Sequence, residues 1–291
     1  MEVVYGHTDS IYIKVESIEQ AHESLKEIND YVRESFPNTL ELNEHPVVLE
    51  FEKYFSSLGV GVTKNRNAGL ISWEDGVFLE EPKFTMTGFT AKRISETPLA
   101  KRIQTTVLEM WVEGKSEDDI VDYCREEYLK TLKGENPITD VVKRSRLKES
   151  RFAVKCSCNK KYNLLEIYDL EYCSKCAKLK KHFTTLDGKR PSIGSGIAGM
   201  LYGHEELGFK YDNSYIYMKI IPLGFYTNPL TNERKNAEWV AGTTFSDLEN
   251  FTPDWGHYAE QVINKAQPIF DAMGWQTLKI KNKQKKLEEW W

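Results

Sequence analysis

The sequence predicts an α+β fold, in which a β-hairpin and small sheet with helices precede a mainly helical part that carries a cysteine-rich insertion. Apolar β-branched and aromatic residues flank a polar cluster at residues 6–10, a pattern typical of strand, tight turn and strand. Apolar residues recur at helical spacing from 98 to 134 and again from 254 to 274. Two close cysteine pairs lie between these helical stretches.

The composition is that of a folded protein with room for two domains. Of its 291 residues, 40% are hydrophobic and 12% aromatic, enough to bury a substantial core. The formal net charge of -5 argues against a protein that coats nucleic acid uniformly. Whether the protein binds nucleic acid therefore depends on where its positive charge is placed. No signal peptide or bilayer-length apolar run is visible, which predicts a soluble, cytoplasmic or nucleoid-associated protein without membrane contact or structural disulfides.

The hairpin carries the first functional signal. Its turn projects the Asp9 carboxylate from a rigid base, which suits holding a divalent metal against a phosphate. The stretch from Tyr5 to Ser10 resembles the Tyr-Gly-Asp-Thr-Asp-Ser motif in the palm of family B DNA polymerases, with His7 in place of the first Asp. The resemblance implies that Asp9 bridges two Mg²⁺ ions and that Thr8 and Ser10 lie against DNA. Imidazole is a poor magnesium ligand, so His7 belongs to the catalytic motif without replacing the missing carboxylate.

A second carboxylate is expected from the next part of the chain. A capping-box pattern beginning at Ser17 starts a helix that ends before Pro37. Residues 47–55 then predict a strand in which Glu50 and Glu52 share a face. This stretch resembles the palm strand that brings a Glu close to the metals in family B polymerases, which makes Glu52 an outer catalytic carboxylate. The alternative is a pair of solvated strand residues.

The next stretch supplies side chains expected to face primer-template DNA. Residues 64–69 resemble the family's Lys-Lys-Arg-Tyr-Ala-Gly strand, and the resemblance assigns Lys64, Asn65 and Arg66 to the duplex. Asn65 replaces the second Lys, which in the family lies near the first Asp of the hairpin motif. The neutral replacements His7 and Asn65 therefore accommodate each other, because losing only one charge would leave the other charge without its partner.

Further resemblances follow in the family's order. Residues 87–98 resemble the junction between palm and thumb, which places Arg93 near the primer strand, although Glu96 stands where the family has Asp. The helical spacing that follows predicts the start of the thumb. A strand at 215–220 and a helix opened by Asp254 resemble its C-terminal part.

Residues 141–190 are strongly basic, with fourteen Lys and Arg against five Asp and Glu. Such a surplus is expected where a surface lies on phosphates, or it is simply a solvated face. Inside it, a C-x-C and a C-x-x-C pair flank a β-rich insert at 162–172 and predict a zinc-ribbon-like insertion at about 150–190 with a closed, structural Zn²⁺ site. The insertion lengthens the grip on DNA or contacts another subunit. Its four ligands are Cys156, Cys158, Cys173 and Cys176.

The last eight residues fit the sliding-clamp interaction pattern Gln-x-x-aliphatic-x-x-aromatic-aromatic. One short helical turn would set three apolar side chains on one side, while the Gln hydrogen-bonds at an edge. Exposed Trp residues at a terminus also call for a partner. The pattern implies a ring-shaped sliding clamp, bound through Gln284, Leu287, Trp290 and Trp291.

Together the resemblances indicate the C-terminal part of a family B DNA polymerase, with palm at 1–95, thumb at 96–280 and a clamp-binding tail at 281–291. No counterpart of the exonuclease domain, the first palm Asp or the fingers is visible. The expected function is therefore the small subunit of a split archaeal or archaeal-virus polymerase, inactive alone. A large subunit would supply the missing parts, and the assembly would use primer-template DNA and dNTP. The alternative is a catalytically inactive subunit that binds DNA and recruits the clamp.

Overall fold

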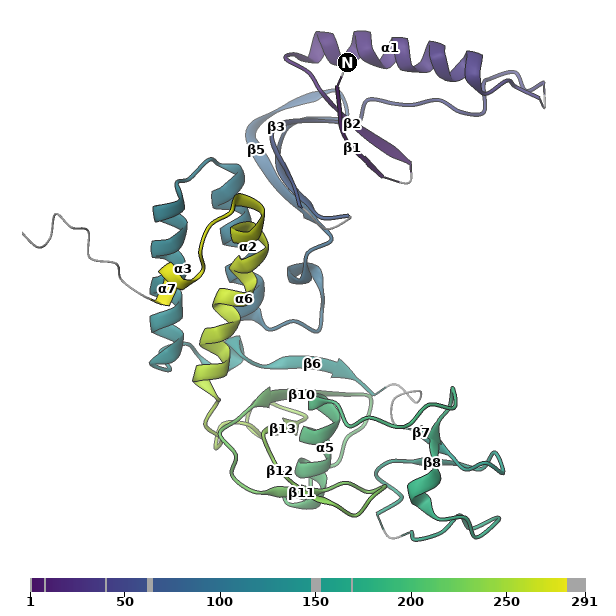
Figure 1. The fold of residues 1–291 in the computed structure, drawn as a ribbon, viewed down its shortest axis with the longest axis vertical. Coiled ribbons are helices and arrows are strands. Elements are labelled where there is room, and N and C mark those ends of the chain that lie inside the picture. The colour runs from purple at the N-terminus through teal and green to yellow at the C-terminus, as the bar shows by residue number, and fades with distance from the viewer. Residues whose placement is uncertain are drawn as a thin grey trace, which may run out of the picture. The chain divides into compact units, whose positions relative to one another are not determined.

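The chain is a mixed α and β protein with small antiparallel sheets (Figure 1). The computed structural model describes residues 2–7, 9–39, 41–61, 65–147, 153–168 and 170–281. These residues form two compact units. The first unit contains the described residues of 1–89, 105–120 and 268–276, and the second contains the described residues of 90–104, 121–267 and 277–291. The mixed α and β composition is confirmed, whereas the bounds of the palm, thumb and tail stay predictions.

The first unit begins with the predicted β-hairpin. Strands β1 (Glu2–His7) and β2 (Ser10–Lys14) pair antiparallel, with the last residue of β1 opposite the first of β2. Helix α1 (Ile18–Ser35) follows. Its predicted cap is confirmed, because the Ser17 Oγ accepts a hydrogen bond from the Gln20 amide at 3.2 Å, which satisfies one of the free amides at the helix start.

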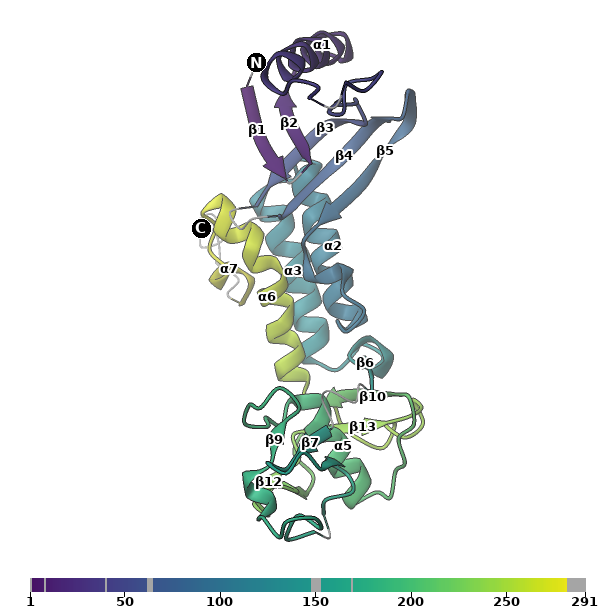
Figure 2. The ribbon, with the colours of Figure 1, turned by 90° about the vertical axis from the view of Figure 1, so that its right-hand side faces the viewer.

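A three-stranded antiparallel sheet completes the β structure of the first unit. Its strands are β3 (Lys53–Val60), β4 (Asn67–Glu74) and β5 (Val77–Thr87), with β4 in the centre (Figure 2). The central strand is buried because it is flanked on both edges. Its buried side chains include Ala68, Ile71 and Trp73.

The predicted strand at 47–55 is wrong over most of its length, since β3 begins only at Lys53. The backbone before β3 has no strand partner among the described residues, and the Asn29 side chain of α1 takes that place. The Asn29 Nδ2 donates to the Leu49 carbonyl at 2.9 Å, and the Leu49 amide donates to the Asn29 Oδ1 at 2.8 Å. A side-chain amide has thus replaced one rung of a β ladder.

The helices predicted at 98–134 and after Asp254 are confirmed. The Asp254 Oδ1 accepts a hydrogen bond from the His257 amide at 2.9 Å, so Asp254 caps the second of these regions. No helix in the described ranges is long and apolar enough to cross a membrane. The helices are α2 (Pro98–Val112), α3 (Glu117–Leu132), α6 (Trp255–Met273) and the short α7 (Leu278–Lys281).

The second unit also contains a sheet. This part of the chain was predicted to be mainly helical, and of the sheet only the strand at 215–220 was predicted. Strand β10 (Ser214–Lys219) lies between β6 (Lys143–Arg146) and β13 (Trp239–Gly242), and helix α5 (Ser195–Glu205) packs on them. A Cβ on Gly199 of α5 would lie 2.9 Å from the carbonyl carbon of Val240, so this close approach requires glycine. The core between them includes Leu201, Met218 and Val240.

The cysteine-rich insertion is built from very short strands. Strand β7 (Ala153–Lys155) pairs with β8 (Lys161–Asn163) on one edge and β9 (Thr184–Thr185) on the other. The β-rich insert predicted at 162–172 is wrong, because its described residues after Asn163 form turns and an isolated bridge. A neighbouring hairpin consists of β11 (Phe225–Thr227) and β12 (Arg234–Asn236).

Glu96 connects three elements of the second unit. Its side chain is only 13% exposed and lies 2.6 Å from Lys265 Nζ on α6 and 3.3 Å from Lys143 Nζ on β6. The Lys265 Nζ also donates to the Thr90 Oγ1 at 2.9 Å. Burial raises the pKa of Glu96, but the hydrogen bond from Lys265 and the charges of both lysines outweigh it, so the pKa is lowered overall.

Replacing Glu96 with Gln should lower the free energy of unfolding by about 2–3 kcal/mol at neutral pH, since it leaves two half-buried ammonium groups without their counter-charge. The pKa of Glu96 is lower in the folded than in the unfolded chain. The stabilisation is therefore present above the unfolded pKa, about 4.3, and is lost as the pH falls further through the folded value. Urea unfolding of wild type and Glu96→Gln across this pH range measures the difference.

The matched control is Glu113→Gln, which removes an exposed ion pair with Lys115 at 3.9 Å. This change should stay within about 0.5 kcal/mol, because exposed pairs contribute little. Equal effects of the two substitutions, or a Glu96→Gln effect that persists at the lowest pH, would contradict the role given to Glu96.

Candidate functional site

Asp9 lies in the turn of the hairpin and is exposed, and Ser10 begins β2 beside it. Both line a groove of about 580 Å³ in the first unit, and Glu50 and Glu52 line the same groove. The structure therefore brings the two predicted catalytic carboxylates, Asp9 and Glu52, to one hollow. Thr8 and the side chain of His7 lie outside the described residues.

The groove runs between the hairpin and the segment that leads into β3. One wall is the continuous run 9–15, which is the open edge of β2, and the other is the run 48–55 that leads into β3. Its apolar floor includes Ala21, Leu25 and Ile28 of α1. An open strand edge beside apolar side chains is able to accept a further strand by main-chain hydrogen bonding.

The carboxylates in this groove do not by themselves make a metal centre. Among the described residues, Asp9 and Glu52 belong to no group of three or more carboxylate, histidine or cysteine side chains close enough to share an ion. Magnesium prefers near-octahedral oxygen coordination and two-metal sites need several such ligands. The carboxylate oxygens present fit Mg²⁺ in kind but fall short in number.

The predicted DNA-facing residues lie just before β4 and just before α2. Asn65 has a left-handed φ of 62°, and its amide donates to the Tyr5 Oη at 3.1 Å, which ties this turn to the hairpin. The Arg66 guanidinium lies 6.0 Å from the centre of the Phe89 ring. Arg93 is exposed and follows the 3₁₀ turn Thr90–Lys92. Lys64 lies outside the described residues.

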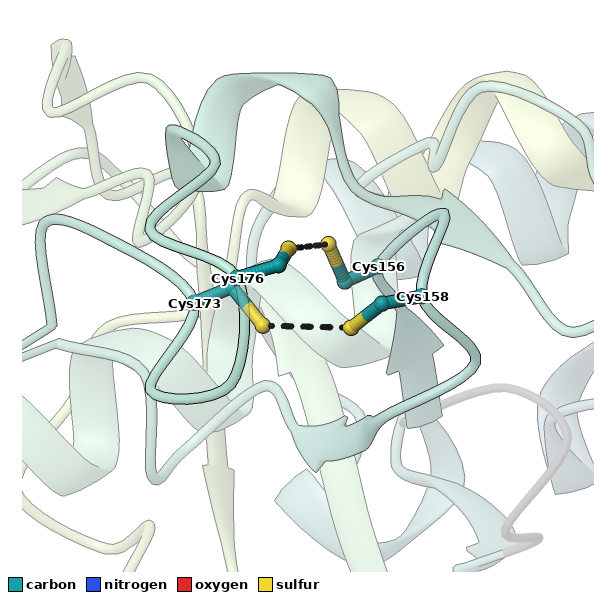
Figure 3. A group of neighbouring side chains, drawn as sticks. All are labelled: Cys156, Cys158, Cys173 and Cys176. Carbon is teal, nitrogen blue, oxygen red and sulfur yellow. Dashed lines mark hydrogen bonds between the residues drawn. The ribbon is translucent and has the colours of Figure 1, made fainter.

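The four cysteines of the insertion come together as predicted (Figure 3). Their sulfur atoms all lie within 4.8 Å of one another, with Cys156 Sγ 3.4 Å from Cys176 Sγ and Cys158 Sγ 3.5 Å from Cys173 Sγ. A tetrahedral Zn²⁺ with Zn–S bonds of about 2.3 Å requires sulfur separations of about 3.8 Å. The donor set and its spacing fit a structural zinc ion and leave no ligand position open for a substrate.

The surroundings of Cys173 favour its thiolate form. Burial raises the pKa of Cys173, but the Tyr162 hydroxyl donates to its sulfur at 3.2 Å and nearby backbone amides add further hydrogen bonds, which lowers the pKa to about 6. By contrast, burial raises the pKa of Cys124 on α3 to about 12, so it is an inert buried thiol.

Two left-handed residues shape the knuckles and were not predicted. Asn159 (φ 65°) follows Cys158, and Ala177 (φ 55°) follows Cys176. The Asn159 amide donates to the Cys156 carbonyl at 2.8 Å, and the Ala177 amide donates to the Cys173 carbonyl at 2.9 Å. Each pair of cysteines is therefore closed by a tight turn, spanning residues 156–159 in the first pair and 173–177 in the second. Asn at this place was a readable signal, because Asn tolerates the left-handed region, whereas Ala gave none.

A small core anchors the cysteine-rich insertion, which we call the cysteine module, to the rest of the second unit. The Phe183 ring stacks on Tyr162 with centroids 5.1 Å apart, and both belong to the apolar cluster around Cys156 and Cys173. Leu230, from the loop between β11 and β12, is part of the same cluster. The four sulfurs are thus held by a packed base and not by a free loop.

The chain belongs to the DNA polymerase family B, whose family model matches residues 1–273. Its fold is similar to that of the family B DNA polymerase from the hyperthermophilic archaeon Pyrobaculum calidifontis, with a TM-score of 0.54 and 18% sequence identity. That match covers 94% of this chain and 27% of the archaeal polymerase. No curated protein matches the chain in the sequence comparison. The predicted family is confirmed, whereas the roles of the individual site residues stay predictions.

The purified chain should contain close to one zinc ion, and Cys173→Ser should lose it, because three thiolates and a hydroxyl bind zinc far more weakly than four thiolates. Metal analysis after dialysis measures the stoichiometry. Cys124→Ala is the matched control and should keep the zinc. Wild-type protein refolded with zinc and still free of it would contradict the site.

Replacing Ala177 with Gly should stabilise the module by about 0.5–1 kcal/mol, because glycine relieves the left-handed strain of an L residue. The thermal unfolding midpoint of the zinc-loaded protein measures the gain. Asn159→Gly, at the equivalent place of the other knuckle, should change the midpoint less, since Asn already tolerates this conformation. A lower midpoint for Ala177→Gly would contradict the turn geometry.

Proposed function

We propose that this chain is the small subunit of a split family B DNA-directed DNA polymerase. It completes a two-metal nucleotidyl-transfer site and grips primer-template DNA. The observation that carries the proposal is the groove, beside the open edge of β2, that both Asp9 and Glu52 line. Carboxylate oxygens of the right kind, too few for two metals, require a partner that brings more.

A strand of the partner would fill this groove. Backbone groups of β2 would pair with it, and the apolar side chains of α1 would be covered by its inward face. A carboxylate on that strand would then stand beside Asp9. The partner would be a large subunit that carries the exonuclease, the fingers and the remaining palm, and it would bind the dNTP.

In the assembled site, bound Mg²⁺ would supply activation of the primer 3′-hydroxyl and stabilisation of charge on the transferring phosphate. The role of Asp9 is to hold those ions from the rigid hairpin turn. Glu52 would act as an outer carboxylate across the groove. His7 keeps the place of the motif's first Asp without supplying an oxygen ligand.

Basic and polar residues of both units are proposed to position the duplex. Arg66 and Arg93 are cations for phosphates, and Asn65 donates or accepts hydrogen bonds at the groove edge of the DNA. Lys64, Thr8 and Ser10 are proposed for the same duplex from the family motifs that they match. These contacts would fix the register of the primer end over Asp9.

The zinc site is proposed to order the insertion, and the C-terminal motif is proposed to recruit a sliding clamp. The clamp motif, which lies outside the described residues, comprises Gln284, Leu287, Trp290 and Trp291. A ring-shaped clamp would receive the two Trp rings and Leu287 in an apolar pocket.

Co-expression with the large polymerase subunit from the same genome tests the proposal by primer extension with Mg²⁺. Extension should require both chains, and Asp9→Ala should reduce it roughly 1,000-fold, because losing a bridging ligand removes about 4 kcal/mol of transition-state stabilisation. Glu81→Ala is the matched control, since Glu81 is an exposed carboxylate on β5 that does not line the groove.

The alternative is a catalytically inactive subunit that binds DNA and recruits the clamp, which the His7 replacement favours. Two chains that associate but extend no primer would support that alternative. Extension that is equally fast with Asp9→Ala would also overturn the catalytic proposal.

A further inference from the structure

A second hollow, of about 260 Å³, lies in the second unit where the cysteine module meets the β11–β12 hairpin. Residues of the cysteine module and of the β11–β12 hairpin line this hollow, and the two parts are side by side in Figures 1 and 2. Three exposed cations surround it, together with the hydroxyl groups of Ser192 and Thr231. The cations are Lys181, Arg190 and Lys235.

The first of these cations, Lys181, projects from a part of the backbone that is held in place. Lys180 is 5% exposed, and its Nζ donates to the carbonyls of Ile167 and Tyr168 at 3.2 Å each. This buried anchor holds the 3₁₀ turn Lys180–His182, so the next side chain, Lys181, emerges from a rigid base.

The other two cations also follow closed loops. Arg190 comes directly after the turn 185–189, which the Thr185 amide closes by donating to the Lys189 carbonyl at 2.8 Å. Lys235 lies on β12 opposite the buried Tyr226, beyond a loop that the Asn228 amide closes on the Glu233 carbonyl at 2.8 Å. The backbone from which each cation projects is therefore fixed before any ligand arrives.

Most of the positive charge around this hollow is unpaired within the part of the chain that the structure describes. Lys181 and Arg190 form no ion pair with another residue that the structure describes. Glu233 also lines the hollow, but its carboxylate is exposed and 3.9 Å from Lys235, which makes a weak pair. From residue 153 to residue 190 the sequence holds nine Lys and Arg against four Asp and Glu, although the whole chain has a net charge of -5. Positive charge is thus concentrated on this module.

We propose that this hollow, the module pocket, binds backbone phosphates of DNA and gives the chain a nucleic-acid contact separate from the palm groove. Lys181 and Arg190 pair with phosphate oxygens, and the hydroxyl groups of Ser192 and Thr231 donate to them. The choice of DNA as the ligand rests on the proposed polymerase function. The cysteine site serves this contact by fixing the module against Leu230 and the β11–β12 hairpin.

The test is the salt dependence of binding to a labelled primer-template duplex, measured by fluorescence anisotropy with the full zinc-loaded chain. The double variant Lys181→Gln/Arg190→Gln should flatten the slope of log K against log salt by about 1.8 between about 50 and 200 mM salt, because two phosphate contacts are lost. The matched control Lys133→Gln/Lys210→Gln carries the same charge change at exposed positions outside the module pocket.

A slope that the module-pocket variant leaves unchanged, with zinc content and thermal midpoint kept, overturns the proposal. So does an equal loss in the control, since that would show a general charge effect. Loss of association with the large polymerase subunit at unchanged DNA affinity would assign the pocket to a protein partner instead. Primer extension is measured separately, so a failed polymerase assay with a flattened slope overturns the proposed function alone.

Discussion

The part of this structure that carries Asp9 depends on the bracing of a two-stranded hairpin, which is at best marginally stable alone. Three contacts supply the bracing. The Tyr12 ring lies 5.4 Å from Tyr5 and 6.0 Å from Phe55, and the Tyr5 hydroxyl accepts a hydrogen bond from the Asn65 amide. Asp9 owes its rigid position to these contacts, and the same bracing leaves the far edge of β2 open along the groove.

The helices and the hairpin were predictable because their signals are local. A capping serine, an apolar stripe and a turn between β-branched residues each act within a few positions. The strand predicted at 47–55 is wrong over most of its length because the sequence does not show whether a partner strand exists. The Asn29 side-chain amide takes the place of such a partner. The sheet around β10 was largely missed for the same reason, since β6 lies far away in the sequence.

The clustering of the four cysteines was also predictable, because two close pairs separated by a short insert are the spacing of a four-cysteine metal site. The spacing of the cysteines does not predict which residues pack against them. Phe183 and Leu230 reach the cysteine cluster from outside the knuckles, and Ala177 adopts a conformation that its side chain disfavours. Tertiary packing imposes these features, so they became visible only in the fold.

The junction before α2 shows how a departure from the family pattern leaves the charge of Arg93 unpaired by its neighbouring carboxylate. Glu96, in place of the family's Asp, is occupied by Lys265 and Lys143 and so does not pair with Arg93. The backbone still fixes Arg93, because its amide donates to the Thr90 carbonyl at 2.9 Å and its carbonyl accepts from the Glu96 amide at 3.2 Å. An exposed guanidinium on a fixed turn, with its neighbouring carboxylate already neutralised, keeps its full attraction for a phosphate.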